Sequence, residues 1–165
     1  MNYNHVNHEF DIVIDKETKI LILGSFPSVK SRESSFYYMH PKNRFWRILG
    51  TIFNDNFTSP NIEIKKDLLH KYHIGLYDVV TECDIIGSSD VSIKNVHYLD
   101  IFSILENYDI KKIFLNGNKA YELFIKAFPS LENRVIKLPS TSPANAKFKE
   151  EDLIGYWKEI IKYYE

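Results

Sequence analysis

The sequence predicts an α/β fold in which a small, mainly parallel sheet lies between two layers of helices. Two features carry this prediction: short runs that are apolar throughout, and intervening segments whose apolar residues recur at helical spacing. The chain has 165 residues, of which 44% are hydrophobic, so it can bury one full core. We therefore expect a single domain over residues 1–165.

The apolar runs predict the buried strands. The first is KILILG at 19–24, which is continuously apolar and ends in glycine, as strands buried on both faces often do. Similar short runs follow: GLYDVV at 75–80, KIFL at 112–115 and RVIKL at 134–138.

The segments between these runs predict the helices. Apolar residues form one stripe at 45–53, at 120–128 and at 153–161, and shorter candidates lie at 62–72 and 99–108. There is no repeat and no linker rich in Pro, Gly or Ser. Because strands and helices alternate, we expect a parallel sheet whose ligands bind where the carboxyl ends of the strands open into loops.

Composition narrows the functional class. The chain carries 21 Lys plus Arg and 22 Asp plus Glu, so its net charge of −1 does not by itself indicate a nucleic-acid partner. Any polyanion would have to be bound by a local basic patch or by backbone amides at helix N-termini. The single cysteine, Cys83, excludes an internal disulfide and a cysteine-clustered zinc site. The chain has no apolar run of about 20 residues and no signal-peptide pattern, so we expect a cytoplasmic protein without a membrane segment.

The first informative loop is GSFPSVKS at 24–31. It has one glycine and no Gly-Lys-Ser/Thr ending, so it is not the phosphate loop of nucleotide hydrolases. Ser28, Lys30 and Ser31 nevertheless offer donors of the kind that position phosphates. An ordinary polar turn after a strand is an equally good interpretation of this stretch alone.

The second loop, FYYMHPKNRFW at 36–46, places aromatic rings beside a neutral amide. Asn43 could be the N-cap of the following helix, since Asn is a preferred cap residue. A cap, however, needs no preceding aromatic rings. His40 is either a hydrogen-bonded structural group or a catalyst, and Arg44 either covers the helix surface or contacts a phosphate.

The third loop, LPSTSPAN at 138–145, again follows a predicted strand. Two prolines bracket three small hydroxyl residues, which predicts a stiff turn lined by hydroxyl groups. A plain strand-to-helix connection would look the same.

In this order and spacing, LILGSFPSVKS, FYYMHPKNRFW, GLYDVV and LPSTSPAN resemble the uracil-DNA glycosylase superfamily. More narrowly, they resemble its hypoxanthine-DNA (deoxyinosine) glycosylase branch, which is related to the mismatch-specific uracil and thymine glycosylases. The resemblance runs from about Lys19 to Asn145. It implies a uracil-DNA glycosylase-like α/β/α fold and a monofunctional DNA repair enzyme. Such an enzyme flips a deaminated base from double-stranded or single-stranded DNA and hydrolyses its N-glycosidic bond, leaving an abasic site. It implies no metal and no cofactor, and we expect a monomer, nucleoid-associated in a bacterium or archaeon.

The resemblance also implies a pocket for the flipped base. Tyr38 matches the position at which mismatch-specific relatives place a stacking phenylalanine, so it would form the floor, and Phe26 would form another wall. Asp78 matches the strand position at which uracil-specific relatives carry a base-reading asparagine. It could accept a hydrogen bond from a purine N–H, or it could brace the loops.

The catalytic amide departs from the mismatch-specific pattern. Those relatives carry a water-positioning asparagine within Gly-Ile-Asn-Pro, where this chain reads Gly24-Ser25-Phe26-Pro27. The hypoxanthine branch uses the asparagine before Arg-Phe-Trp, which is Asn43 here. An amide suffices if it orients water toward an oxocarbenium-like sugar. His40, a loop hydroxyl or backbone amides would then stabilise the leaving base.

The resemblance places the remaining candidates on DNA. Ser28, Ser31 and Ser140 would contact phosphates, and Lys30 and Arg44 are further candidates for the DNA backbone. A second group, Thr141, Ser142 and Pro143, would enter the minor groove. Small residues make a weak wedge, so we expect a modest rate and a reliance on poorly paired bases.

Other functions stay open from sequence. Phe26 at the usual amide position is compatible with a catalytically silent nucleic-acid-binding module. A uracil or thymine mismatch glycosylase is another alternative, since the sequence does not rank these bases against hypoxanthine. A hydrolase of free nucleosides would be expected to carry an acidic metal-binding cluster, and no Asp-rich motif of that kind is evident.

Overall fold

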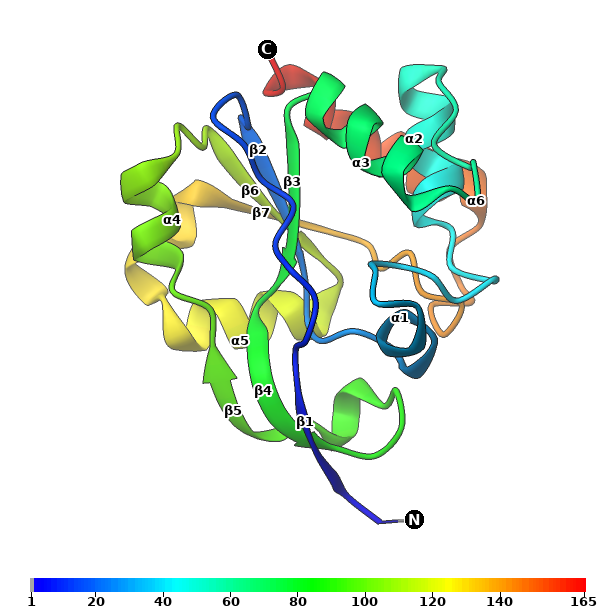
Figure 1. Ribbon diagram of the computed structural model, residues 1–165. Coiled ribbons are helices and arrows are strands. Elements are labelled where there is room, and N and C mark those ends of the chain that lie inside the picture. The colour runs from blue at the N-terminus through cyan, green and yellow to red at the C-terminus, as the bar shows by residue number, and fades with distance from the viewer. Residues whose placement is uncertain (1) are drawn as a thin grey trace.

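A parallel sheet of four strands forms the centre of the computed structural model, which describes residues 2–165 (Figure 1). Its strand order is β3-β2-β6-β7, and β2 pairs in parallel with both of its neighbours. The strands are β2 (Ile20–Gly24), β3 (Ile74–Asp78), β6 (Lys112–Asn116) and β7 (Val135–Leu138). The predicted α/β fold is thus confirmed.

Helices cover both faces of this sheet. Figure 1 shows α2 (Phe45–Phe53), α3 (Ile62–Lys71) and α6 (Glu150–Trp157) gathered on one side, and α4 (Ile101–Asn107) and α5 (Asn118–Ala127) on the other. Short 3-10 helices follow α5 at Pro129–Arg134 and α6 at Lys158–Lys162. None of the helices in residues 2–165 is long and apolar enough to cross a membrane.

The continuous apolar run of β2 follows from this burial on both faces. Ile20 and Ile22 pack into the core cluster under α2, α3 and α6, whereas Leu21 and Leu23 pack into the cluster on the opposite face. Successive side chains of a strand point to opposite faces, so a strand between two cores needs apolar residues at every position.

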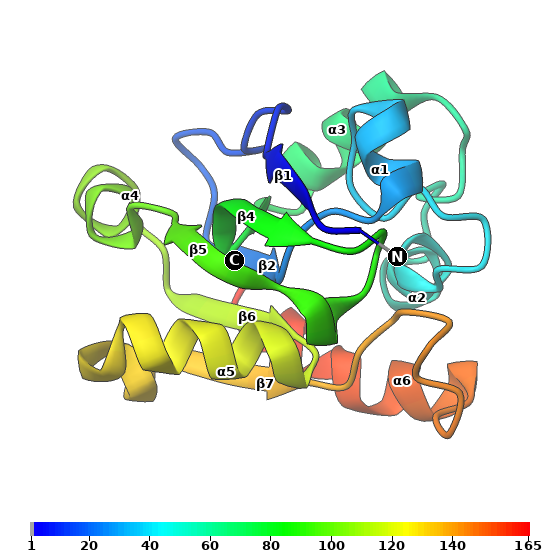
Figure 2. The same cartoon turned by 90° about the horizontal axis from the view of Figure 1, so that it is seen from below.

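A second sheet was not predicted from the sequence. It is antiparallel, with the order β1-β4-β5, and consists of β1 (Asn4–Asn7), β4 (Val80–Ile85) and β5 (Lys94–Tyr98) (Figure 2). These strands are partly exposed and rich in polar residues, so they lack the apolar runs that marked the central strands.

The strand predicted at 75–80 is divided between the two sheets. β3 ends at Asp78, and Val80 already belongs to β4. At the junction the Val79 N–H donates to the carbonyl of Gly24, 2.8 Å away. The side chain of Asp78 is therefore held where the chain leaves the parallel sheet.

The first loop is also corrected. Val29–Ser34 form a short helix, α1, and Ser28 is its N-cap, because the Ser28 side chain accepts a hydrogen bond from the Ser31 N–H. The sequence had predicted an irregular loop over this stretch. A six-residue helix has too few periodic apolar positions to be recognised from spacing alone.

Candidate active site

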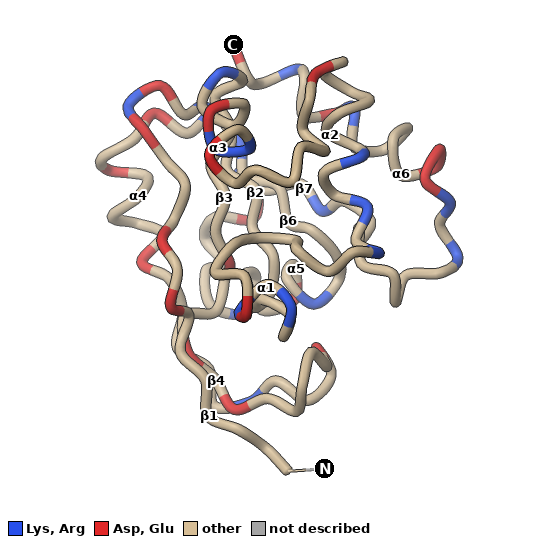
Figure 3. The backbone as a smooth tube through the Cα atoms, turned by 45° about the vertical axis from the view of Figure 1, so that its right-hand side comes forward, with Lys and Arg blue, Asp and Glu red and all other residues tan. Residues whose placement is uncertain are grey.

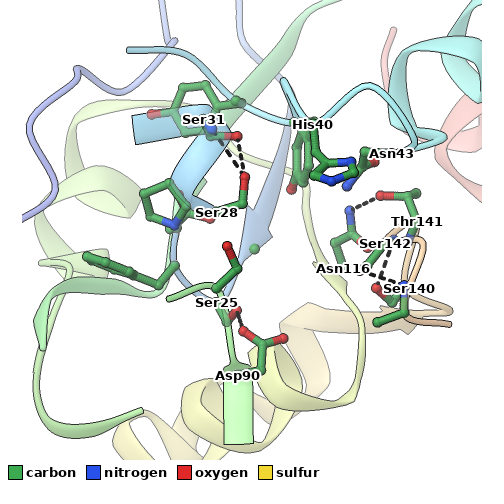
Figure 4. Close-up of a pocket in the computed structure, with 18 of the residues that line it drawn as sticks. Ser25, Ser28, Ser31, His40, Asn43, Asp90, Asn116, Ser140, Thr141 and Ser142 are labelled. Atoms are coloured by element: carbon green, nitrogen blue, oxygen red, sulfur yellow. Dashed lines mark hydrogen bonds between the residues drawn. The ribbon is translucent and has the colours of Figure 1, made fainter. Parts of the chain in front are cut away.

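A pocket of about 320 Å³ lies at the carboxyl ends of the parallel strands (Figure 4). Gly24 ends β2, Asp78 ends β3 and Asn116 ends β6, and all three line it. Residues 140–144, which follow β7, complete the wall. Its volume is at the small end of the range for small-molecule sites, as suits a single flipped base.

The three loops singled out in the sequence meet at this pocket. The predicted site residues that line it are Phe26, Ser28, Ser31, Tyr38, His40, Asn43, Asp78, Ser140, Thr141, Ser142 and Pro143. Lys30 and Arg44 do not line it. The convergence follows from the topology, because all parallel strands present their carboxyl ends at the same edge of the sheet.

Asn43 lines the pocket while also serving the following helix. Its Oδ1 accepts a hydrogen bond from the Phe45 N–H at 3.0 Å, which identifies the oxygen of the amide, since a backbone N–H can only donate. The Asn43 N–H in turn donates to the His40 carbonyl at 2.9 Å. The expected cap position is wrong by one residue, because the N-cap of α2 is Arg44, which makes no side-chain capping hydrogen bond. The hydrogen bond from the Phe45 N–H still orients the Asn43 amide, and Nδ2 makes no hydrogen bond to the described residues.

His40 lies beside Asn43 at one edge of the pocket (Figure 4). Its Nδ1 accepts a hydrogen bond from the Lys42 N–H at 3.1 Å. In the neutral ring the proton is therefore on Nε2, which leaves an N–H donor for a ligand.

Tyr38 is the one ring of Phe36-Tyr37-Tyr38 with a backbone in the left-handed region, at φ 55°. That conformation is costly for a bulky residue and is typical of functional sites. The ring stacks on Phe45, with centroids 4.1 Å apart. Burial of the hydroxyl, with the nearby charge of Asp78, raises the pKa of Tyr38, so the hydroxyl stays protonated.

The other two rings of this stretch belong mainly to the core. Phe36 stacks on Trp46 at 5.8 Å, and the Tyr37 hydroxyl donates to the Asp11 carbonyl at 2.7 Å. Phe26 has an exposed fraction of only 8% and packs in the opposite core cluster while lining the pocket. Most of the aromatic side chains in these loops thus pack in the core that supports the pocket.

Asp78 is paired with a residue that the sequence had not indicated. Its Oδ2 lies 2.8 Å from His8 Nε2, and the two side chains are 5% and 0% exposed. His8 comes from the segment after β1, about 70 residues earlier in the chain. No motif in the sequence marks it.

Asn116 is a second pocket residue that the sequence did not single out. Its Oδ1 accepts from the Thr141 N–H and its Nδ2 donates to the Thr141 hydroxyl, both at 3.0 Å. Gly117, at φ +101°, lets the chain turn beside Ser140, whose Cβ would lie 3.0 Å from any Cβ added to the glycine. The ends of β6 and β7 are thereby joined beneath the pocket.

Thr141 and Arg44, both expected to contact DNA, hold the third loop by contacts inside the protein. Thr141 is fully buried. The Arg44 guanidinium donates to the carbonyls of Ser142 at 2.9 Å and Asn145 at 3.1 Å, and to that of Phe148. Arg44 therefore shapes the loop, and the DNA contacts of both residues stay predictions.

Ser31, expected to contact a phosphate, also makes its hydrogen bonds inside the protein. It has an exposed fraction of 2%, and its hydroxyl oxygen accepts from the Met39 N–H at 3.1 Å. It therefore links α1 to the second loop. Lys30 is exposed on α1, where its ammonium lies 3.5 Å from Glu33.

Asp90 adds another carboxyl to the pocket. It begins the short 3-10 helix Asp90–Ser92, and its Oδ1 accepts from the Ser25 hydroxyl at 2.6 Å (Figure 4). Asp90 as a whole residue is exposed, but partial desolvation by the surrounding protein raises the pKa of its carboxyl above the ordinary value. The charge of Asp78 raises this pKa further. The hydrogen bond from Ser25 and the charge of Lys119 oppose it.

The raised pKa makes a stability prediction for Asp90→Asn. A carboxyl whose pKa is raised by folding destabilises the native state as pH rises through the raised value. Asparagine removes that charge and keeps an oxygen for Ser25, so we expect a higher Tm near neutral pH, by a few degrees at most because solvent screens an exposed group. The gain should shrink as pH is lowered toward the ordinary value of 3.8.

Thermal unfolding followed by circular dichroism at several pH values measures this effect. The matched control is Asp67→Asn on α3, an exposed carboxylate without an ion pair to the described residues. An Asp90→Asn variant that is less stable than wild type at neutral pH would show that the carboxylate is favoured in the folded state.

The positive charge around the pocket is local. Figure 3 shows Lys and Arg positions gathered along the side that carries α2 and α6 and near α1, while acidic positions are frequent along α4 and β4. Lys42 in the second loop and Lys147 after the third are exposed. Within residues 2–165, no group of three or more His, Cys, Asp or Glu residues is placed to hold a metal ion.

Comparisons with known proteins agree with this geometry. A family model described as the uracil DNA glycosylase superfamily matches residues 12–161. A hypoxanthine DNA glycosylase of Methanosarcina barkeri is 36% identical over 93% of this chain and 96% of its own length. One of Methanosarcina acetivorans is 35% identical over 96% of this chain and 99% of its own length.

A solved structure shares the architecture as well. The solution NMR structure of a candidate uracil DNA glycosylase from Methanosarcina acetivorans aligns with a TM-score of 0.77 and 32% identity. The alignment covers 92% of this chain and 96% of the other. With a pocket at the strand ends and a family match over most of its length, this chain belongs to the uracil DNA glycosylase superfamily.

Proposed function

We propose that this protein removes hypoxanthine from DNA by hydrolysing the N-glycosidic bond of a flipped deoxyinosine, which leaves an abasic site. The observation that carries the proposal is the meeting of the Asn43 amide, the Tyr38 ring and the Asp78 carboxylate in one pocket sized for a base. The two relatives named hypoxanthine DNA glycosylase support this choice of base.

Each of the three groups answers one requirement of the reaction. Tyr38 provides an aromatic surface for a base taken out of the stack, a contact that contributes about 1–3 kcal/mol. Asp78 accepts a hydrogen bond from the N1–H of hypoxanthine. Asn43 holds and orients the water that attacks the sugar.

The bond between C1′ of the sugar and N9 of the base breaks with its electron pair left on the base. The amide oxygen of Asn43 has a second lone pair beside the one bonded by the Phe45 N–H, and with it accepts a hydrogen bond from the attacking water. Water then adds its oxygen to C1′ and releases a proton, and the departing base takes up one proton overall. The Nε2–H of His40 donates to the base as it leaves.

The enzyme is expected to be monofunctional. An additional strand-cleaving step would need an amine in the pocket to form a Schiff base with the opened sugar. No lysine is among the described residues that line the pocket. The abasic site is therefore the expected product.

The rim of the pocket supplies the contacts to DNA. The hydroxyl oxygens of Ser140 and Ser142 accept backbone N–H groups at 3.1 Å and keep their hydrogens for donation to phosphates. Ser28 lines the pocket across from Ser140 (Figure 4), whereas Lys30 lies on α1 outside the lining. Exposed Pro143 is the wedge that enters the minor groove. These contacts can be made to either double-stranded or single-stranded DNA. The protein acts as a monomer, in the cytoplasm or at the nucleoid.

The direct test uses end-labelled duplexes with one deoxyinosine opposite each normal base, and the same strand unpaired. Purified protein followed by alkali should cleave the strand at the lesion, and mass spectrometry should detect free hypoxanthine. Matched duplexes with deoxyuridine or deoxyadenosine report selectivity, and the Asn43→Ser variant controls for a contaminating glycosylase. Tight DNA binding without abasic sites would instead identify a catalytically silent module.

A further inference from the structure

We propose that His8 is a positioning residue that holds Asp78 as a pure hydrogen-bond acceptor, so that the pocket selects bases with an N–H at the position of hypoxanthine N1. This inference rests on the proposed function and deepens it. It assigns a part of base selection to the segment that directly follows β1, the N-terminal strand of the smaller sheet.

The contact is short and shielded from water. His8 Nε2 lies 2.8 Å from Asp78 Oδ2, and the His8 side chain is fully buried. The backbone is fixed as well, because β1 pairs with β4 and the His8 N–H donates to the Thr81 carbonyl at 2.8 Å. The position of the His8 ring beside Asp78 is therefore fixed.

Among the described residues, Asp78 is the only hydrogen-bonding partner of the His8 imidazole. Four aromatic rings enclose the imidazole at centroid distances of 4.5 to 6.2 Å, namely Phe10, Phe26, Tyr37 and Tyr77. Nδ1 is buried and has no partner among the described residues. A carboxylate can only accept, so the hydrogen bond requires the proton on Nε2 and fixes the orientation of both groups.

Gly24 determines where the second oxygen of Asp78 lies. A Cβ built on Gly24 would be 2.5 Å from Asp78 Oδ1, which is closer than any side chain could tolerate. The carboxylate thus rests against the bare backbone of the first loop, at the lining of the pocket. No hydrogen bond joins Oδ1 to the described residues, so this oxygen is available to a ligand.

An available carboxylate oxygen distinguishes deaminated from normal purines. Hypoxanthine carries a hydrogen on N1 and can donate it to Oδ1. Adenine has a lone pair at N1, which would face the negative charge and leave it unpaired. A site built to hydrogen-bond an N–H can reject the analogue without it by about 10⁴-fold or more. His8 maintains this selection because it keeps the carboxylate from turning away.

The test compares two substrates on matched variants. One duplex carries deoxyinosine and the other deoxynebularine, whose purine base has a lone pair at N1. His8→Phe fits the aromatic surroundings but cannot donate, whereas His8→Gln retains a donor. We expect His8→Phe to reduce the ratio of kcat/KM values for the two substrates by at least about tenfold, and His8→Gln to restore part of it. Binding to a duplex with a tetrahydrofuran abasic analogue should not change, since no base occupies the pocket.

The outcomes separate the two proposals. Wild-type excision of hypoxanthine with unchanged selectivity in His8→Phe would overturn the role of His8 and leave the proposed function standing. Absence of excision by the wild-type protein would overturn both. If His8→Phe does not fold, Gly24→Ala displaces Oδ1 with His8 intact, and unchanged selectivity in that variant would likewise overturn the inference.

Discussion

Asn43→Ser is expected to lower the rate of base excision by about 10²- to 10³-fold, the usual effect of removing one preorganised polar group that acts on the transition state. Serine lacks the amide that orients water toward the sugar. Its hydroxyl can, however, accept the hydrogen bond that the Phe45 N–H now donates to Asn43. The free energy of unfolding should therefore change by no more than a typical surface substitution, roughly ±0.5 kcal/mol.

Single-turnover excision of deoxyinosine, measured together with thermal unfolding, separates the two roles of Asn43. Asn43→Ala removes both the amide and the acceptor of the Phe45 N–H, and should combine the rate loss with a loss of about 1 kcal/mol in stability. If Asn43→Ser retains the wild-type rate, the catalytic role is wrong and the side chain serves only the helix.

Trp157→Ala is expected to lower the free energy of unfolding by about 3–5 kcal/mol, the usual cost of truncating a buried tryptophan. Trp157 is fully buried at the end of α6 and packs edge-on against Phe45 at 5.8 Å. Its Nε1–H donates to the Pro139 carbonyl at 2.9 Å, at the start of the third loop. The Tm should fall by about 6–20 °C, and loosening of this loop should weaken excision as well.

Chemical denaturation measures the free energy, and two controls define its origin. Trp157→Phe retains most of the apolar surface and loses the hydrogen bond, so it should cost less than alanine. Tyr156→Ala changes a neighbour that is 58% exposed and should be close to neutral. A loss below about 1 kcal/mol for Trp157→Ala would mean that α6 contributes little to the core.

The fold class was predictable because its signals are local. Ile20–Gly24 is apolar at every position since it lies between two cores, and the stripe of α2 repeats with the period of a helix. The second sheet was not predictable in this way. Its strands are short, partly exposed and defined by pairing between distant segments, as when β1 pairs with β4 about 80 residues later.

The candidate site was likewise predictable in its local chemistry but not in its long-range contacts. The chemistry of the three loops could be proposed from residue types and from the resemblance to a family, and the parallel topology accounts for their meeting at one edge. Ser31, Thr141 and Arg44 were expected on DNA, but their hydrogen bonds are made inside the protein. Sequence gives the donors of a side chain and not the direction in which they point.

The sequence by itself determined the alternation of strands and helices and the loops that carry an amide, rings and a carboxylate, because periodicity and residue chemistry are written along the chain. Only the tertiary structure decided that His8 lies against Asp78 and that Asp90 lines the same pocket. It also decided that Arg44 donates hydrogen bonds to the third loop. These contacts join segments tens of residues apart. They depend on how the two sheets and the loops between their strands are packed against one another, which no local pattern encodes.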